Sequence, residues 1–330
     1  MDNSLLKNLL IEYEQKRLNA LKSLDFRKEE IYKKFPRLKE IEDELNKYAI
    51  SFAKSILTSN GNLSLEDLKS KIEKLKEEKI SILKSDKKDS NYLEVFYECP
   101  ICKDTGYITE GSTTVMCSCL KQRLFNEEYN KSNIANIDKE NFANFNLSLF
   151  SDEVDTARYG EDVSPRENMK EIKHSAFKFI QNFDDPSEKN LLFSGCTGLG
   201  KTFLSNCIVN ELIKKGKTVL YQTAPVMLDS LITAMFKNDA SLSNNLLNVD
   251  LLVIDDLGTE TMNSMKFTEL YKIINTRLLN QNGKVTKTII STNLDLQNLF
   301  NTYDERLVSR FVGHYNIYHF FGDDIRFKKK

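Results

Sequence analysis

Apolar side chains recur at helical spacing through the first 85 positions, between lysines and glutamates, and those from 38 to 56 follow steps of three and four residues. That spacing places the apolar side chains on one face of a helix. Three such stretches predict three helices, and the mixed charges of 69–79 are typical of a solvated helix face rather than a nucleic-acid patch. The apolar positions are Leu6, Leu10, Tyr13, Leu21, Leu24, Ile31 and Phe35, then Leu38, Ile41, Leu45, Tyr48, Phe52 and Ile56, then Leu65, Leu68, Ile72, Leu75 and Ile82.

The pattern changes after about residue 190 to short apolar runs separated by longer amphipathic stretches. Short apolar runs that alternate with helices are typical of a parallel sheet covered by helices on both faces. We therefore predict an α/β fold for the second half of the chain, preceded by an α-helical N-terminal domain. The predicted strands are Leu191–Ser194, Thr218–Gln222, Leu251–Asp255, Thr288–Thr292 and Tyr315–Phe320.

Changes in composition divide the chain into four predicted parts. Residues 1–95 are expected to form the helical domain, 96–125 a small cysteine-rich element, 126–168 a linker and 169–330 the α/β domain. The linker carries phenylalanine and leucine among asparagine and serine. This pattern indicates a connector that docks on a folded surface.

The overall composition excludes some classes of protein without selecting a function. The 330 residues are 40% hydrophobic and 29% charged, and the formal net charge is −1. Such a chain has no global cationic field, so any DNA contact is expected to be local or assembled by oligomerisation. No apolar run approaches the roughly 18 residues of a membrane span. The N-terminus also lacks the pattern of a signal peptide, so we expect a cytoplasmic protein without a membrane partner.

The strongest chemical signal is the sequence Gly-Cys-Thr-Gly-Leu-Gly-Lys-Thr at 195–202, between a predicted strand and a predicted helix. Glycines let successive N–H groups point at a phosphate, and the helix adds its positive N-terminal end. Lys201 is predicted to reach the β- and γ-phosphates of ATP, and Thr202 to bind Mg²⁺. The predicted nucleotide-binding residues here are Gly195, Cys196, Thr197, Gly198, Leu199, Gly200, Lys201, Thr202 and Phe203.

Two carboxylates, Asp255 and Asp256, end the predicted strand that begins at residue 251. Asp255 is predicted to bind Mg²⁺ beside the nucleotide, and Asp256 to orient or deprotonate the attacking water. Asn293 ends the next predicted strand and is a further catalytic candidate, because its amide can position that water. The alternative for Asn293 is a cap for the helix that begins near Asp295.

Arg306 and Arg310 lie four residues apart on a helix that a Thr302–Glu305 capping box is predicted to start. An arginine presented to the γ-phosphate of a neighbouring subunit stabilises the charge of the transition state. Surface salt bridges are the alternative for this pair. Arg326, near the end of the chain, is a further candidate for nucleotide binding.

Four of the six cysteines form two close pairs separated by a short loop. Four thiolates suit tetrahedral Zn²⁺, and too few residues surround them to build a core, so we expect a structural metal. Redox-active thiols or simple packing are the alternatives. Cys196 and Cys207 lie outside the cluster and are expected to be small packing residues. The clustered residues are Cys99, Cys102, Cys117 and Cys119.

Together these residues resemble the AAA+ ATPases, and specifically the bacterial replicative helicase loaders of the DnaC/DnaI type, with IstB-like ATP-binding proteins as near relatives. In such loaders the second arginine of the last segment contacts the neighbouring nucleotide, which implies that role for Arg310 and a supporting role for Arg306. Most AAA+ enzymes carry Glu at the position of Asp256, so the shorter acid suggests slow hydrolysis. The segments that carry the resemblance are Gly195–Thr202, Leu251–Gly258, Ser291–Asn293 and Glu305–Phe311.

The resemblance implies an ATPase that uses Mg²⁺, carries Zn²⁺ and associates with itself through the ATP site. Its zinc-bearing helical half would hold the hexameric replicative DNA helicase, and the loader would deliver it onto single-stranded DNA. Hydrolysis would be slow and stimulated by the partner or DNA. An IstB-like transposition helper ATPase is the alternative, and a non-catalytic zinc scaffold is a third. Phe236 resembles a residue that faces DNA in loaders, with core packing as its alternative.

Overall fold

Three long helices form the N-terminal part of the chain in a computed structural model that describes residues 3–58, 65–130, 139–279 and 283–328. They are α1 (Asn3–Lys34), α2 (Pro36–Thr58) and α3 (Leu65–Ser85), which confirms the three predicted helices. The chain divides into two compact units, residues 7–115 and residues 1–6 with 116–330. No helix among the described residues is long and apolar enough to cross a membrane.

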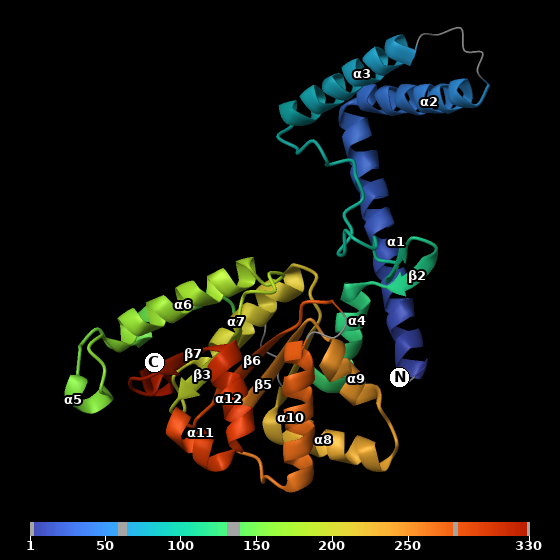
Figure 1. Cartoon of the computed structure of the whole chain (residues 1–330). Coiled ribbons are helices and arrows are strands. Elements are labelled where there is room, and N and C mark those ends of the chain that lie inside the picture. The colour runs from blue at the N-terminus through green and yellow to red at the C-terminus, as the bar shows by residue number, and fades with distance from the viewer. Residues whose placement is uncertain (1–2, 59–64, 131–138, 280–282, 329–330) are drawn as a thin grey trace. The chain divides into compact units, whose positions relative to one another are not determined.

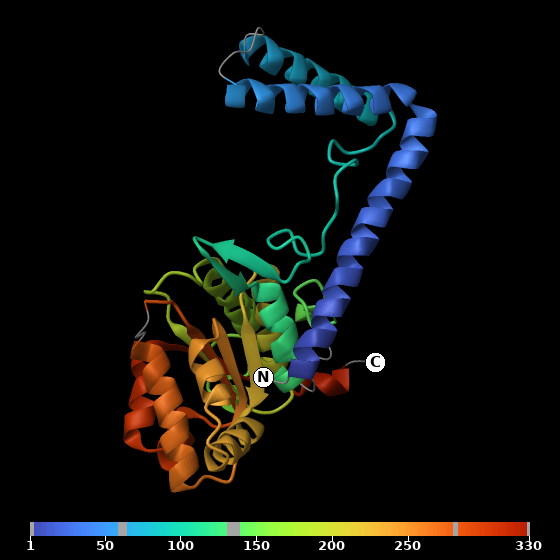
Figure 2. The same cartoon turned by 90° about the vertical axis from the view of Figure 1, so that its right-hand side faces the viewer.

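In the unit of residues 7–115, α2 and α3 lie side by side (Figures 1 and 2). Ion pairs join them, because Arg37 contacts Glu78 at 2.8 Å and Lys79 contacts Glu42 at 3.0 Å. The unit also contains the hairpin of β1 (Tyr107–Glu110) and β2 (Thr113–Met116). Its small buried cluster consists of Ile31, Leu38, Leu83 and Leu93.

The larger unit contains a five-stranded parallel sheet with the strand order β4-β5-β6-β3-β7. Each predicted strand is present with ends within two residues of the prediction, so the predicted α/β fold is confirmed. The strands are β3 (Asn190–Gly195), β4 (Val219–Thr223), β5 (Leu251–Leu257), β6 (Lys287–Thr292) and β7 (Tyr315–Phe320).

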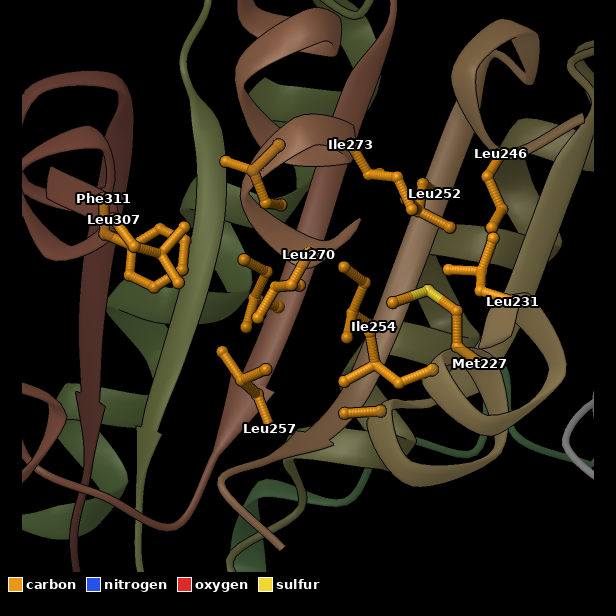
Figure 3. Packing of buried hydrophobic residues seen from close by; sticks show 14 of the residues in the cluster. Met227, Leu231, Leu246, Leu252, Ile254, Leu257, Leu270, Ile273, Leu307 and Phe311 are labelled. Carbon is orange, nitrogen blue, oxygen red and sulfur yellow. The ribbon is translucent and has the colours of Figure 1, made fainter. Parts of the chain in front are cut away.

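Helices cover both faces of this sheet because its strands are apolar on both sides. Leu191 and Ile289 face one layer, whereas their chain neighbours Leu192 and Ile290 face the other. Figure 3 shows Leu252 of the second set among the side chains of the covering helices. The first layer contains α6 (Pro165–Gln181) and α7 (Lys201–Lys214), and the second α8 (Ala224–Phe236), α9 (Ser241–Asn248), α10 (Ser264–Leu279), α11 (Leu296–Thr302) and α12 (Glu305–His314).

The phenylalanine-rich segment at 142–150 packs on the first helical layer, as its composition predicts. Phe142 stacks on Phe177 with ring centroids 4.2 Å apart, and Phe145 meets Phe203 edge-on at 5.7 Å. Short helices η2 (Leu147–Leu149) and α5 (Thr156–Tyr159) continue this segment, and η3 (Ile325–Lys328) follows β7 near the end of the chain.

The predicted capping box of α12 is wrong. Thr302 is the last residue of α11, and Tyr303 separates the two helices. Asp304 caps α12 instead, because its Oδ1 accepts the backbone N–H of Arg306 at 2.9 Å. A carboxylate directly before the helix reaches this free N–H, whereas the hydroxyl of Thr302 belongs to the preceding helix.

Side-chain amides close the outer edge of the sheet along β4. They come from α4 (Ser118–Phe125) and the π-helix η1 (Asn126–Asn130). Gln122 Oε1 accepts the N–H of Val219 at 2.5 Å, and Asn130 Oδ1 accepts that of Tyr221 at 2.9 Å. Both amide groups also donate to the carbonyl of Val219, at 3.0 and 3.1 Å. These amides therefore replace the hydrogen bonds that a sixth strand would make.

We predict that Gln122→Leu lowers the free energy of unfolding by about 1 to 3 kcal/mol, because it leaves the buried N–H of Val219 without an acceptor. Urea denaturation measures the change. Gln297→Leu is the matched control on an exposed part of α11 and should cost less than about 0.5 kcal/mol. Equal midpoints for the two variants would contradict the role given to Gln122.

Candidate functional site

The loop at 195–200 connects β3 to α7 in a tight turn that only glycine fits at two positions. A Cβ atom on Gly195 would lie 2.0 Å from the carbonyl oxygen of Phe320. Gly198 has a φ of 76°, in the left-handed region that favours glycine. Gly200 precedes α7 without a side-chain cap, so the first N–H groups of that 14-residue helix remain available to an anion.

Lys201 lies at the centre of this loop and is 5% exposed. Its ammonium donates to the carbonyl oxygens of Gly195 at 2.7 Å and Cys196 at 2.8 Å, and to Asn293 Oδ1 at 2.9 Å. Burial lowers the pKa of Lys201, although Asp256 and Asp255 act in the opposite direction. The geometry thus brings Asn293 to Lys201. Asp295 caps α11, so the alternative interpretation of Asn293 as the helix cap is wrong.

Asp255 accepts three hydroxyl groups from three different elements. Thr202 on α7 donates to Asp255 Oδ2 at 3.1 Å, Tyr221 on β4 donates to the same oxygen at 2.7 Å, and Ser291 on β6 donates to Asp255 Oδ1. Burial and Asp255 raise the pKa of Tyr221 well above its ordinary value, so Tyr221 is a neutral donor. Hydroxyl and carboxylate oxygens are the ligands that Mg²⁺ prefers, so Thr202 and Asp255 fit this ion.

Asp256 follows in a left-handed conformation, with φ of 55°. Its N–H donates to Ser291 Oγ at 3.1 Å, and its side chain lines the cavity beside the loop. Burial, together with the charge of Asp255, raises the pKa of Asp256. A carboxylate with a raised pKa is a better proton acceptor than an ordinary aspartate.

Lys201, Thr202, Asp256 and Asn293 line one cavity of about 350 Å³, and Asp255 lies behind Thr202. An apolar recess adjoins it beside Gly200, where Phe145, Phe150 and Phe203 gather. The composition of the 142–150 segment predicts that it docks, but nothing in its sequence places it at the site. Tyr221 carries no signal for the site in the sequence, and Ser291 belongs to the Ser291–Asn293 segment of the resemblance without a role of its own being predicted. The residues around the larger cavity are Glu140, Thr197, Gly198, Leu199, Gly200, Lys201, Thr202, Phe203, Asp256, Asn293, Ile325 and Arg326.

The three candidate arginines have different surroundings. Arg306 pairs with Asp304 at 2.9 Å on the surface, the arrangement that the salt-bridge alternative predicts. Arg326 lines the cavity and pairs with Asp324 at 2.5 Å. Arg310 has no ion pair within the described parts of the chain, and its buried Nε has no hydrogen-bond partner there.

The four clustered cysteines converge, with all sulfur atoms within 4.8 Å of one another. Zn–S bonds of about 2.3 Å in a tetrahedron place sulfur atoms about 3.8 Å apart, so this set fits zinc. Asp104 supports the first pair, because its carboxylate accepts the N–H groups of Glu98 at 3.0 Å and Cys99 at 2.8 Å. Of the other two cysteines, Cys207 is buried as predicted, but Cys196 is exposed, so its predicted packing role is wrong.

The family model of IstB-like ATP-binding proteins matches residues 144–330, which is more than half of the chain. This chain belongs to that family. ATP is therefore the nucleotide that the cavity is expected to take, and the parallel sheet with its P-loop is of the AAA+ type.

Among curated relatives, the replicative helicase loader DnaC of Escherichia coli (strain K12) is 31% identical over 139 residues, 41% of this chain and 54% of that protein. The DnaC of Buchnera aphidicola subsp. Baizongia pistaciae (strain Bp) is 29% identical over 148 residues, 44% of this chain and 58% of that protein. A crystal structure of the DnaC helicase loader is 24% identical and covers 53% of this chain and 96% of its own, with a TM-score of 0.43. The chain thus spans little more than half the length of the curated relatives it matches.

Because the pKa of Asp256 is raised, we predict that Asp256→Asn increases the free energy of unfolding of the nucleotide-free protein, and that this increase depends on pH. Because the folded protein disfavours the ionised carboxylate, the variant should be more stable at pH 7, by less than about 1 kcal/mol for a half-exposed group. The difference should vanish as the pH falls toward about 4, where aspartate is protonated in the unfolded chain. Asparagine also tolerates the left-handed backbone. Calorimetric melting temperatures across this range measure the effect.

Asp239→Asn is the control of opposite sign. Hydrogen bonds from Ser241 lower the pKa of Asp239. Loss of that carboxylate should therefore destabilise the protein at pH 7 and have less effect as the pH falls. The same sign for both variants would contradict the electrostatic origin of the gain at Asp256.

The cysteine cluster predicts one Zn²⁺ per chain. Cys102→Ser should lower the ratio of zinc to protein to well below one, because it removes one of the four thiolates of this closed site. Elemental analysis of the purified protein measures the ratio. Cobalt substitution should give the absorption of a tetrahedral thiolate site. Cys196→Ser, at an exposed cysteine outside the cluster, should keep full occupancy. A wild-type protein without metal would exclude the zinc site.

Proposed function

We propose that this protein is an ATP-dependent loader of the hexameric replicative DNA helicase. The observation that carries the proposal is the convergence of Lys201, Thr202 and Asn293 at one cavity, with Asp255 bonded to Thr202, in a chain whose curated relatives are named replicative helicase loaders. ATP binding follows from the family. We propose in addition that the protein hydrolyses ATP, binds the helicase, delivers it onto single-stranded DNA and is located in the cytoplasm.

In the proposed reaction, the loop N–H groups and Lys201 bind the phosphates, and Thr202 and Asp255 hold Mg²⁺. That ion would neutralise charge on the phosphates. Asp256 is proposed to accept a proton from the attacking water. Asn293, which accepts a hydrogen bond from Lys201, would orient that water. Arg326 lines the same cavity and is proposed to contact the nucleotide. The short side chain of Asp256 supports slow hydrolysis that a partner or DNA accelerates.

Arg310 is proposed to complete the site of a neighbouring subunit. A guanidinium without an ion pair among the described residues can stabilise charge on a γ-phosphate that another copy binds. Self-association through the ATP site follows from this role. Arg306 is proposed as a supporting residue at the same surface, where it now pairs with Asp304.

The first part of the chain is proposed to hold the helicase, with zinc on the four cysteines as a structural element. We also propose the domain boundaries expected from the sequence, after residues 95, 125 and 168. Single-stranded DNA is proposed to contact α8 near Phe236, whose side chain is 76% exposed. That exposure excludes the core-packing alternative for Phe236, and an exposed ring is a platform on which a base stacks.

The proposal predicts an ATP-dependent complex between this protein and the replicative helicase of the same organism. Size-exclusion chromatography with light scattering should detect a complex with ATP that Lys201→Ala abolishes, because the variant lacks the cation that binds the phosphates. Arg310→Ala should still bind ATP but hydrolyse it about 1,000-fold more slowly. Absence of any complex with wild-type protein would exclude the loader.

Mixed subunits test the shared site. A Lys201→Ala subunit lacks ATP but offers Arg310, whereas an Arg310→Ala subunit binds ATP but offers no arginine. Neither should hydrolyse ATP alone, and their mixture should. In size-exclusion chromatography Phe236→Ala should keep helicase association, and in a loading assay on single-stranded DNA it should lose delivery of the helicase. Association with a transposase instead of the helicase would favour the IstB-like transposition helper, the alternative that the family description supports.

A further inference from the structure

Two residues, the buried Tyr303 and the exposed Asp304, join α11 to α12. Tyr303 is 3% exposed, and its N–H donates to Leu299 O at 2.9 Å, which ends α11. The next residue, Asp304, is the cap of α12. The position of Tyr303 therefore determines where α12 begins.

Glu260 fixes the side chain of Tyr303 from the loop that follows β5. The Tyr303 hydroxyl donates to Glu260 Oε1, and Glu260 Oε2 accepts the N–H of Gly258 at 2.9 Å. Burial and the neighbouring carboxylate raise the pKa of Tyr303, so its hydroxyl keeps its proton and remains a donor. The contact joins the loop after Asp255 and Asp256 to the start of α12.

The end of β6 holds this loop in place. Thr292 Oγ1 donates to the carbonyl of Leu257 at 2.6 Å and accepts the N–H of Leu294 at 3.1 Å. Gly258 has a φ of 101°, and a Cβ there would lie 2.6 Å from Leu294 Cδ1. The left-handed φ of Gly258 favours glycine at this turn. Tyr303 is therefore bonded, through Glu260, to a loop that hydrogen bonds fasten to the end of β6.

The position of Arg310 depends on where α12 begins, and so on the joint at Tyr303. It lies seven residues beyond Tyr303, about 10 Å along a helix with a rise of 1.5 Å per residue. Leu307 and Phe311 on the inner face of α12 are fully buried, so the helix moves as one body. A misplacement of about 1 Å in a catalytic group lowers a rate by up to about 100-fold.

We infer that Glu260 and Tyr303 are positioning residues. They fix the position of Arg310, the arginine that this subunit offers to its neighbour. Neither side chain lines the ATP cavity of its own subunit. They act through α12 on Arg310, and so on the ATP that the next subunit holds. The inference rests on the proposed function, because it requires a site completed by Arg310 of another copy.

The test places Tyr303→Phe in either partner of the mixed-subunit assay. This change removes the hydroxyl and keeps the ring in the core. In the arginine donor, Lys201→Ala with Tyr303→Phe, we expect at least a tenfold lower kcat at unchanged KM for ATP. In the acceptor, Arg310→Ala with Tyr303→Phe, we expect full hydrolysis with a Lys201→Ala donor. Glu260→Ala in the donor should match Tyr303→Phe, and Glu260→Gln should recover part of the rate.

The asymmetry separates positioning from general stability. Equal losses in donor and acceptor would show a structural role and overturn the inference, as would full activity with the altered donor. If the parent pair of Lys201→Ala and Arg310→Ala fails to hydrolyse ATP, the shared site itself is excluded. Melting temperatures of the double variants verify that each remains folded.

Discussion

The buried carboxylate of Asp255 is the group on which the geometry of the site depends. It is 4% exposed and accepts hydroxyls from α7, β4 and β6. A buried carboxylate is costly unless hydrogen bonds surround it, so these three hydrogen bonds hold the three elements together. β4 and β6 are the two neighbours of β5 in the sheet, and α7 carries the residues that follow the P-loop. One side chain thus aligns the ends of three strands with the start of a helix.

Lys201 complements this anion without pairing with it. Its ammonium is held by two carbonyls and Asn293, and no carboxylate of the described chain lies within ion-pair distance of it. A buried cation with neutral partners gains from phosphate oxygens that approach it, because charged hydrogen bonds are stronger than neutral ones. The same contact draws Asn293 toward the nucleotide. The cavity therefore has its charged groups in place before a ligand arrives.

The edge of the sheet explains how β4 can carry Tyr221. An edge strand has free N–H and C=O groups on one side, and here Gln122 and Asn130 occupy them. Tyr221 receives a bond to its own N–H from Asn130 while its hydroxyl reaches Asp255. Residues about ninety positions earlier in the chain thus fix the register of a strand that contributes to the site.

The sequence by itself determined the local parts: three N-terminal helices, five strands, the phosphate loop, the two aspartates, Asn293 and the cysteine spacing. Each depends on neighbours within a few residues, so periodicity and motif spacing were sufficient. The family resemblance, confirmed by the family match, likewise depends on short motifs. The exposure of Cys196 and the cap at Asp304 concern single positions, but neighbouring residues alone did not decide them. The tertiary structure decides whether a side chain is covered and which backbone N–H groups need a cap.

Only the tertiary structure selected the partners of those local parts. Tyr221, Ser291 and Phe145 meet the site because β4, β5 and β6 are neighbours in space and because the 142–150 segment folds back over α7. Glu260 and Tyr303 lie 43 positions apart, and nothing in their local sequences joins them. A buried carboxylate or hydroxyl takes whichever complementary group the packing of the sheet brings within reach, so these contacts follow from strand order and not from chain order.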